Sequence, residues 1–318
     1  MHKTVFLNAA KINFDGNLNF SPLESITEIT LFDHSNHDEI LERVKGHQVV
    51  ITKELPLPGE LLRQFLPDVK LICEAGTGFN NIDIAAATEK GITVCNVPGY
   101  STEAVAQLAI TFMLNFCSSL IQQQYMIKDG NLSNFSKHLQ VPHVEMQNKT
   151  LGILGAGSIG RQVIKIARAF GMNVLTYSRT PKRWDDPAVQ SVSLEELLQQ
   201  SDFVSIHSPL TTETKYLIDR SKLKLMKPTA FLINTARGAI IKEEDLIPAL
   251  QNGEIAGAAL DVQDPEPPRP DNPLFTMDNV ILTPHIGWQT IESRQRLVNL
   301  LAQNINAFKQ GKPLNTVN

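Results

Sequence analysis

The chain of 318 residues has little of several residue types that mark specialised classes of protein. It holds three cysteines, Cys73, Cys95 and Cys117, and no C-x-x-C pair, which argues against a disulfide framework or a thiolate metal site. The cysteines lie in apolar segments, so we expect buried, unreactive thiols and a reducing, cytoplasmic location. The sequence contains no run of roughly 20 apolar residues, as a membrane helix needs, and no signal-peptide pattern. We therefore expect no membrane contact.

A basic excess is also absent. The 29 Lys and Arg residues are outnumbered by 33 Asp and Glu residues, which leaves a net charge of −4. Proteins that bind nucleic acids usually carry a basic face, so this balance argues against a nucleic-acid partner. A hydrophobic content of 42% with 19% charged residues is typical of a folded chain. At about 150 residues per domain, the length indicates roughly two domains.

Short apolar runs alternate with helical stretches over the first hundred residues. The runs are unbroken, as in Val49-Val50-Ile51, and this is typical of parallel strands whose faces are both covered by helices. The pattern therefore predicts an α/β domain with a parallel sheet. Strands are expected at residues 4–8, 28–33, 48–52, 70–74 and 92–96, and helices at residues 37–45, 59–65 and 84–90.

After Pro98-Gly99 a second alternation follows. Residues 103–125 lack Gly and Pro and predict one long helix, capped by Ser101 or Thr102 and followed by a polar loop to residue 147. A final helix, at about residues 290–310, is long enough to return to the first domain. Between them we expect strands at residues 150–154, 173–177, 202–207, 230–234, 256–260 and 280–282, and helices at residues 158–170, 194–200 and 242–252.

A glycine-rich loop opens this second segment. It reads Gly155-Ala156-Gly157-Ser158-Ile159-Gly160 and lies between a predicted strand and a predicted helix. In that context G-x-G-x-x-G is typical of dinucleotide binding, because the glycines allow a tight turn, close approach to a pyrophosphate and close helix–strand packing. A glycine turn without a ligand is the alternative. A hydrolase nucleophile elbow is excluded, because it needs Gly where Ala156 stands, and a Walker A lysine is absent.

The residues after the next strand indicate which dinucleotide binds. NAD sites normally have an Asp or Glu there, which holds the ribose hydroxyls. Residues 178–183 contain no acid but three cations and two hydroxyls, among them Ser178, Arg179 and Thr180. Because Arg grips phosphate through charge-assisted hydrogen bonds, we favour NADP(H) and leave NAD(H) open. The alternative for Lys182 and Arg183 is a solvated surface pair.

Three ionisable side chains occur close to strand ends or in a constrained loop. Arg237 and His285 each follow a predicted strand, and Glu266 lies in a loop with five prolines between residues 265 and 273. Ligands of open α/β sheets bind outside the carboxyl ends of the strands. We therefore expect these three side chains to converge there.

The sequence resembles the D-isomer-specific 2-hydroxyacid dehydrogenases over nearly its whole length. The run Asn96-Val97-Pro98-Gly99-Tyr100, and the Trp288 that follows Pro-His-Ile-Gly, are most similar to the glycerate dehydrogenase and hydroxypyruvate/glyoxylate reductase branch. Ser178 departs from the family, since its NAD-using members carry Asp there. Seven segments match in order, at residues 75–83, 96–100, 155–160, 207–210, 234–238, 261–267 and 284–288.

The resemblance implies both a fold and a reaction. The fold is a Rossmann dinucleotide-binding domain, residues 100–287, inserted into a flavodoxin-like substrate-binding domain of residues 1–99 and 288–318. The reaction is NAD(P)H-dependent reduction of glyoxylate, hydroxypyruvate or a related small anionic 2-keto acid to the D-2-hydroxy acid. A dehydrogenase for D-lactate, phosphoglycerate or phosphite is the alternative, and a dinucleotide-sensing binding protein is a more distant one. The resemblance also implies a homodimer formed through the cofactor domain; the expected interface is the richly apolar helix at residues 103–125 with the loop to residue 147.

The chemistry of such a reduction assigns catalytic roles to Arg237, Glu266 and His285. An unperturbed imidazole titrates near neutrality, so His285 would give a proton to the forming alkoxide. Glu266, paired with the other ring nitrogen, would favour the imidazolium and fix the ring. Arg237 suits the carboxylate and ketone oxygens of the substrate. The N–H groups of Thr77 and Gly78 would receive the carboxylate as a small anion nest.

Further residues are expected around these. Trp288 either lines the substrate pocket or braces the histidine, and His207 is expected to pack beside the cofactor without transferring protons. Asn80, Asn81 and Asp83 are expected to cap a helix, and no metal is expected. The residues expected to contact the cofactor are Gly155, Gly157, Ser158, Ile159, Gly160, Ser178, Arg179, Thr180, Ser208, Pro209, Thr235, Ala236, Arg237, Asp261, His285 and Gly287.

Overall fold

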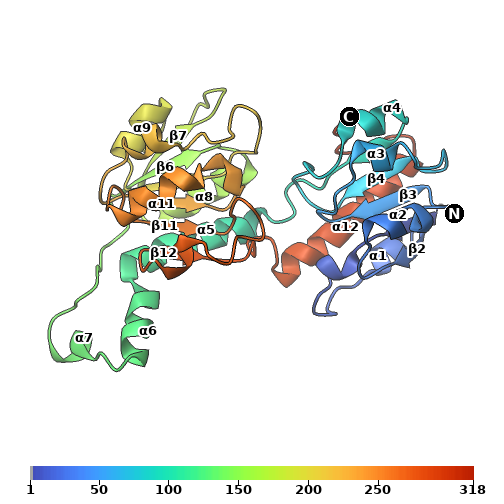
Figure 1. Cartoon of the computed structure of the whole chain (residues 1–318). Helices are drawn as coiled ribbons and strands as arrows, with labels where there is room; N and C mark the ends of the chain where they lie inside the picture. The colour runs from blue at the N-terminus through green and yellow to red at the C-terminus, as the bar shows by residue number, and fades with distance from the viewer. Residues whose placement is uncertain (1–2) are drawn as a thin grey trace. The chain divides into compact units, whose positions relative to one another are not determined.

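The computed structural model describes residues 3–318 (Figure 1). The chain divides into two compact units. Unit 1 comprises the residues up to Ser101 together with Trp288–Asn318, and unit 2 is Thr102–Gly287. The first crossing between them thus falls two residues later than the boundary expected from the sequence.

Unit 1 is built on a five-stranded sheet in the order β2-β1-β3-β4-β5. Every neighbouring pair of strands is parallel, and this order is that of flavodoxin-like sheets. The strands are β1 (Lys3–Phe6), β2 (Glu28–Leu31), β3 (Val49–Thr52), β4 (Leu71–Glu74) and β5 (Thr93–Cys95). The helices are η1 (Ala9–Lys11), α1 (Ser21–Glu24), α2 (His37–Arg43), α3 (Gly59–Leu62), α4 (Ile84–Glu89) and α12 (Ile291–Lys309).

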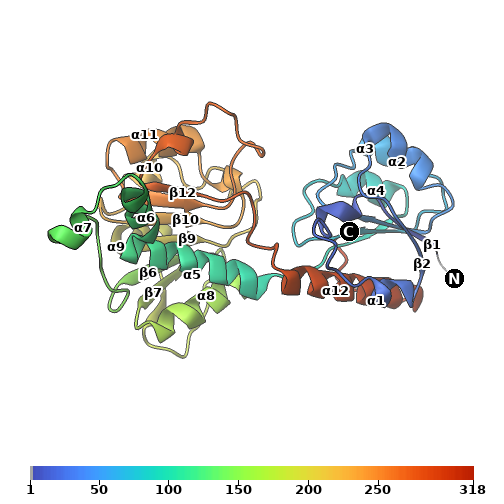
Figure 2. The same ribbon diagram turned by 90° about the horizontal axis from the view of Figure 1, so that it is seen from below.

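Alternate residues of these strands pack on opposite faces of the unit 1 sheet. Ile51 and neighbouring odd positions join a core with α1 and α12, whereas Val50 and Ile72 join a second core with α2, α3 and α4. Figure 2 shows the two helix layers on either side of the sheet. α12 contributes Leu297 and Leu301, both fully buried, and each such side chain stabilises the fold by roughly 1.5–3 kcal/mol.

Unit 2 is a doubly wound, seven-stranded parallel sheet in the order β12-β11-β10-β9-β6-β7-β8. The order reverses beside β6, as in Rossmann folds. The strands are β6 (Thr150–Leu154), β7 (Asn173–Tyr177), β8 (Val189–Ser191), β9 (Phe203–Ile206), β10 (Phe231–Asn234), β11 (Gly257–Leu260) and β12 (Val280–Leu282). The helices are α5 (Thr102–Ser118), α6 (Leu120–Lys128), α7 (Ser133–Ser136), α8 (Ser158–Ala169), α9 (Leu194–Gln200), α10 (Arg220–Leu223), η2 (Gly238–Ile240), α11 (Glu243–Gln251) and η3 (Pro273–Thr276).

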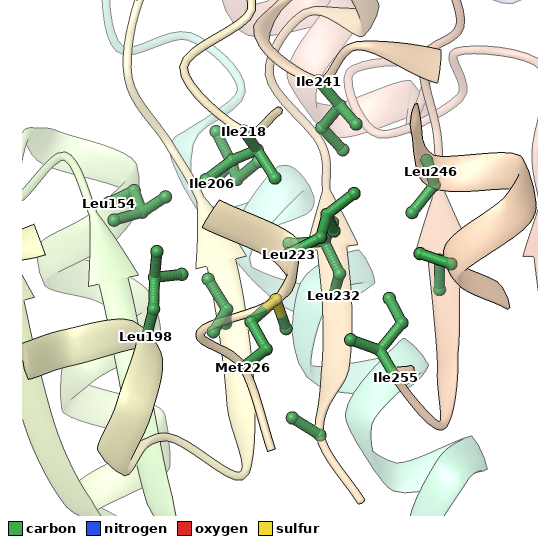
Figure 3. Packing of buried hydrophobic residues seen from close by; sticks show 14 of the residues in the cluster. Leu154, Leu198, Ile206, Ile218, Leu223, Met226, Leu232, Ile241, Leu246 and Ile255 are labelled. Atoms are coloured by element: carbon green, nitrogen blue, oxygen red, sulfur yellow. The ribbon is translucent and has the colours of Figure 1, made fainter. Parts of the chain in front are cut away.

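The unit 2 sheet also has a core on each face. α5 and α8 cover one face, while α9, α10 and α11 cover the other. Figure 3 shows the second core, in which Leu154, Ile206 and Leu232 project from the strands towards Leu223 and Leu246 of the helices. The predicted fold class, a Rossmann domain inserted into a flavodoxin-like domain, is confirmed.

The prediction of one long helix over residues 103–125 is wrong, because the helix is interrupted at Ser119. Ser119 has a left-handed backbone (φ 50°), its hydroxyl donates to the Pro142 carbonyl at 2.7 Å, and Asn115 Oδ1 accepts from the N–H of Ile121. α5 and α6 therefore meet at a bend of 59°. Over residues 3–318, no individual helix combines the length and apolar character of a membrane span, although this bent pair does so jointly.

α6 and α7 extend away from the sheet and helices of unit 2 (Figure 1). α6 has no buried residue, and apolar side chains on α6, α7 and the following segment are exposed. They are Leu120, Ile121, Tyr125, Ile127, Leu132, Phe135, Leu139 and Val144. We call residues 120–144 the apolar arm.

Candidate active site

The glycine loop lies where β6 ends and α8 begins. Gly155 has φ +98°, and a Cβ built there would lie 2.6 Å from the Ser208 hydroxyl oxygen. A Cβ on Gly160 would overlap the carbonyl oxygen of Gly155, so both positions require glycine. By contrast, a Cβ on Gly157 would meet nothing within 4 Å. The loop therefore leaves open space at the N-terminus of α8, where a pyrophosphate would face the helix dipole and the N–H groups of Ser158 and Ile159.

Two further observations fit a dinucleotide at this edge of the sheet. Ser208 and Thr235 follow the carboxyl ends of β9 and β10, and the Thr235 hydroxyl is buried without a hydrogen-bond partner among the described residues. The Ser208 hydroxyl donates to the Leu154 carbonyl at 3.1 Å. His207 is half-buried, and desolvation lowers its pKa to about 4. It is therefore neutral at pH 7, which fits the packing role expected for it.

The end of β7 carries the residues expected to distinguish the two dinucleotides. Ser178 follows β7 directly, and its hydroxyl accepts from the N–H of Ala156 at 3.2 Å, which ties it to the glycine loop. Arg179 and Thr180 are exposed. The charge of Arg179 helps to lower the pKa of Glu213, a smaller effect than that of the hydrogen bond from Thr211.

The imidazole and the carboxylate expected to act together are in contact. Nδ1 of His285 lies 3.1 Å from Oε2 of Glu266, and Oε1 of Glu266 accepts from the N–H of Gln263 at 2.9 Å. The carboxylate is thus fixed from both sides, and Nδ1 is the ring nitrogen that faces it. His285 has a left-handed backbone, with φ 54°, a conformation that costs energy in a residue other than glycine.

Arg237 lies after β10, on the same edge of the unit 2 sheet, and is half-buried. Its Nη1 donates to the Ala236 carbonyl at 2.7 Å. A Cβ on Gly238 would overlap the Gln263 carbonyl, so the backbone after Arg237 packs directly against the loop that carries Glu266. The three predicted catalytic residues are in this way anchored to neighbouring segments.

Asp261 has a role that the sequence did not reveal. Its side chain is 1% exposed; Oδ1 accepts from the Thr283 hydroxyl at 2.6 Å and from the N–H of Ile286 at 2.8 Å, and Oδ2 accepts from the N–H of Gly287 at 2.9 Å. Burial raises its pKa, against these hydrogen bonds, which lower it. Asp261 therefore holds the turn that carries His285, and the nicotinamide contact expected for it stays a prediction.

In unit 1, the loop over residues 76–78 follows β4. The amide of Asn96 donates to the Thr77 carbonyl at 2.6 Å, the Thr77 hydroxyl donates to the Val97 carbonyl at 3.1 Å, and the N–H of Val97 donates to the Gly76 carbonyl at 2.8 Å. The N–H groups of Thr77 and Gly78 have no acceptor within residues 3–318. They are therefore available to a small anion, and the carboxylate contact expected for them stays a prediction.

Beneath this loop lie two charged residues that sequence reasoning missed. Lys53 is 3% exposed and Glu74 is fully buried. The sequence did hold a signal for both residues, because Lys53 directly follows a strand and Glu74 ends one, and the other residues of these strands are buried and mostly apolar. Trp288 is 4% exposed and packs in the unit 1 core, with Nζ of Lys53 4.2 Å from the centroid of its ring.

Only one of the three expected helix caps is observed at α4. Oδ1 of Asp83 accepts from the N–H of Ala86 at 3.0 Å. The expectation for Asn81 is wrong, because its amide donates instead to the Leu55 carbonyl and to Oε2 of Glu74, both at 2.9 Å. Asn80 is exposed, with no cap hydrogen bond among the described residues.

The cysteines and the metal-ligating residue types add no second centre. All three thiols are free and buried, and the Sγ atoms of Cys73 and Cys95 lie 3.3 Å apart on adjacent strands. Across residues 3–318, no group of three or more His, Cys, Asp or Glu side chains is placed to hold a metal ion.

A doubly wound sheet with a dinucleotide loop, beside a histidine paired with a carboxylate, defines a class: the NAD(P)-dependent oxidoreductases. The family model for the D-isomer specific 2-hydroxyacid dehydrogenase NAD binding domain matches residues 110–287. The chain belongs to the D-isomer-specific 2-hydroxyacid dehydrogenase family. The family and enzyme class expected from the sequence are confirmed, and the cofactor is a nicotinamide dinucleotide.

Individual relatives cover nearly the whole chain. A hydroxypyruvate reductase of Blautia hydrogenotrophica is 35% identical over 326 residues, covering 99% of both chains. A glyoxylate reductase of Thermococcus litoralis is 40% identical over 285 residues, covering 88% of this chain and 86% of that one. Among solved structures, an acyclic imino acid reductase in complex with NADPH and D-Arg superposes with a TM-score of 0.90 at 28% identity, covering 99% of this chain and 100% of that chain.

Proposed function

We propose that the protein is an NADP(H)-dependent reductase of small 2-keto acids of the glyoxylate and hydroxypyruvate type, and that it yields the D-2-hydroxy acid. The observation that carries this proposal is the 3.1 Å contact between His285 and Glu266, on the same sheet edge as the glycine loop and Arg237. The names of the relatives support the substrate class. A reducing, cytoplasmic location fits the three free thiols.

The chain's own residues would divide the remaining chemistry among them. The dinucleotide, when bound, supplies the hydride for carbon 2 of the keto acid. His285, with Nδ1 held by Glu266, donates a proton from Nε2 to the ketone oxygen as it becomes an alkoxide. Arg237 polarises the ketone and binds the carboxylate, and the N–H groups of Thr77 and Gly78 bind the carboxylate.

Removal of the acid tests this assignment. His285→Ala should lower kcat/KM by about 10²- to 10⁴-fold with every 2-keto acid, which is the usual contribution of a positioned general acid. His138→Ala is the matched control, because His138 is exposed in the apolar arm, and it should leave kcat/KM unchanged. If the His285 variant kept most of its turnover, the assignment would be wrong.

A substrate panel tests the reaction itself. Glyoxylate, hydroxypyruvate, pyruvate and 3-phosphohydroxypyruvate should be compared by kcat/KM, with the chirality of the product determined for the last three, because the product of glyoxylate has no stereocentre. The panel should include each keto acid together with an excess of amine, because one similar structure is that of an imino acid reductase. We expect glyoxylate or hydroxypyruvate to rank first without amine. A clear preference for the phosphorylated acid or for the imine would overturn the proposed substrate class.

The choice of NADP(H) over NAD(H) rests on Ser178 and Arg179. A carboxylate at position 178 would repel a 2′-phosphate, whereas Arg179 attracts one. NADPH should therefore exceed NADH at least about tenfold in kcat/KM, a difference of 1.4 kcal/mol, and Ser178→Asp should reverse the order. The double variant Lys182→Ala with Arg183→Ala tests the role of this pair. A loss of NADPH preference would mean that the pair binds the phosphate, and an unchanged preference would mean that it is a solvated surface pair. A tenfold preference of the wild type for NADH would contradict the assignment.

We also propose that two copies of the chain associate through α5, α6 and the segment up to residue 147. The apolar arm supports this, since Phe135 is 75% exposed and Tyr125 is 63% exposed, and monomers rarely expose continuous apolar surface. Sedimentation velocity at micromolar concentration should show a dimer, and Tyr125→Asp with Phe135→Asp should shift it towards monomer. A wild type that sediments as a monomer throughout would remove the proposal.

A further inference from the structure

A buried pair of opposite charges lies directly beneath the 76–78 loop of unit 1. Glu74 is the last residue of β4, and Lys53 follows β3. A Cβ built on Gly76 would lie 3.2 Å from Oε1 of Glu74 and 3.2 Å from Nζ of Lys53. Both charged ends therefore touch the backbone whose next two N–H groups are available to an anion.

Each charged group in this cluster has a polar partner. Nζ of Lys53 lies 2.6 Å from Oε1 of Glu54, so the ammonium already has one carboxylate partner. Oε1 of Glu74 accepts from the N–H of Glu54 at 3.0 Å and Oε2 accepts from the amide of Asn81 at 2.9 Å. Ionisation of Glu74 therefore adds one negative charge directly beneath the loop.

Glu74 changes its charge in the neutral range. Burial raises its pKa to about 7, against Lys53, the Asn81 amide and the Glu54 N–H, which lower it, and the Glu54 carboxylate also raises it. On its own strand it is next to the Cys73 thiol, which pairs with Cys95 of β5. The proton on Glu74 therefore changes the charge beneath the loop by one unit at physiological pH.

We propose that the carboxyl of Glu74 sets the affinity of the 76–78 loop for the substrate carboxylate, binding being tight when Glu74 is protonated and weak when it is ionised. This inference rests on the proposed function. With Glu74 neutral, the N–H groups of Thr77 and Gly78 attract the anion. With Glu74 ionised, one further negative charge beneath the loop opposes it. Glu74 is thus a positioning residue, and it exchanges no proton with the substrate.

The test compares KM between the wild type and Glu74→Gln from pH 6 to pH 9, at saturating NADPH. Any pH dependence that the two proteins share cancels in the ratio of their KM values. The ratio of wild type to variant should be near one at pH 6 and should rise about tenfold by pH 9, as one charge near the binding loop warrants. Glu28→Gln is the matched control, because Glu28 lies on the edge strand β2 with a side chain 65% exposed, and its ratio should stay near one.

A second variant protects the test against misfolding. The amide in Glu74→Gln presents a donor to the Asn81 amide, which is itself a donor there, and this destabilises the cluster. Asn81→Ala instead removes a hydrogen bond that favours the ionised carboxylate, so the midpoint of the KM–pH curve should move to higher pH and KM at pH 8 should fall. A ratio independent of pH, or an Asn81 variant with weaker binding at pH 8, would overturn the inference. Absence of 2-keto acid reduction by the wild type at pH 6 would instead overturn the proposed function.

Discussion

Two loops of this protein offer backbone N–H groups to anions, and they differ in what lies behind them. The glycine loop at residues 155–160 leads at once into α8, a helix of 12 residues. The 76–78 loop leads into irregular chain, and α4 begins only at Ile84. Behind it lie Lys53 and Glu74 instead. A helix dipole is fixed at every pH, whereas a pair of ionisable groups is not. The glycine loop should therefore bind the anion of the cofactor independently of pH, whereas binding of the substrate anion to the 76–78 loop should depend on pH.

The largest effect is expected from crowding the loop that depends on the helix. Gly160→Ala places a Cβ against the carbonyl oxygen of Gly155. Because that oxygen belongs to the backbone, the loop itself has to move. Affinity for the dinucleotide should fall by about 100-fold or more, roughly 3 kcal/mol, as measured by fluorescence titration with NADPH. Gly157→Ala should leave the melting temperature unchanged, since its Cβ meets nothing within 4 Å, and should weaken NADPH binding less. Equal affinity in wild type and Gly160→Ala would show that helix–strand approach does not shape this loop.

The second-largest effect is expected in the free energy of unfolding, whose pH dependence reports on the buried carboxyl of Glu74. Because folding raises the pKa of Glu74 from 4.5 to about 7, its stabilising contribution is complete below pH 4.5 and is lost as the pH rises through 7. From pH 5 to pH 8 the free energy of unfolding of unit 1 should fall by about 2–3 kcal/mol more in the wild type than in Glu74→Gln.

The two tryptophans allow each unit to be followed separately, because Trp184 lies in unit 2 and Trp288 in unit 1. Urea titrations in a Trp184→Phe background, read by the fluorescence of Trp288, would measure the unfolding of unit 1 at both pH values. Parallel pH profiles for wild type and Glu74→Gln would show that the buried carboxyl does not titrate on folding.

The smallest effect is expected from a larger residue in the 76–78 loop. Gly76→Ala brings a Cβ to 3.2 Å from the ends of two side chains, Lys53 and Glu74, and side-chain ends move more readily than backbone. KM for the keto acid should rise by about tenfold, or 1.4 kcal/mol, while KM for NADPH stays the same. A change in the NADPH constant of similar size would mean that the two loops are not independent.

Most of the fold could be predicted because its strands are short, fully apolar runs. β6 and β7, for example, have the bounds that the sequence indicated. β8 and α10 were missed because three or four residues are too few to display a period. The break at Ser119 could not be read locally, since it depends on the Pro142 carbonyl, 23 residues further along the chain.

In the candidate site, too, some residues could be predicted from the sequence and others could not. Arg237, Glu266 and His285 belong to recognisable motifs, and the Glu266–His285 contact was expected from their chemistry. Lys53 and Glu74 are single charges at strand ends, without a motif, and their importance appears only when both are found buried beneath one loop. Asn81 resembled a helix cap because nothing in the sequence indicates that a carboxyl from β4 reaches its amide.

The three buried cysteines have a practical consequence. The hydrogen bond with Cys95, together with burial, raises the pKa of the Cys73 thiol, and burial raises the pKa of the Cys117 thiol. Thiols that are both protonated and inaccessible react slowly with maleimides and iodoacetamides. A cysteine introduced at an exposed position, such as Arg179 or Phe135, would then be the one fast-reacting thiol of the chain. Dyes or spin labels could be attached there without removing any of the three native cysteines, which makes the cofactor edge and the apolar arm accessible to distance measurements in solution.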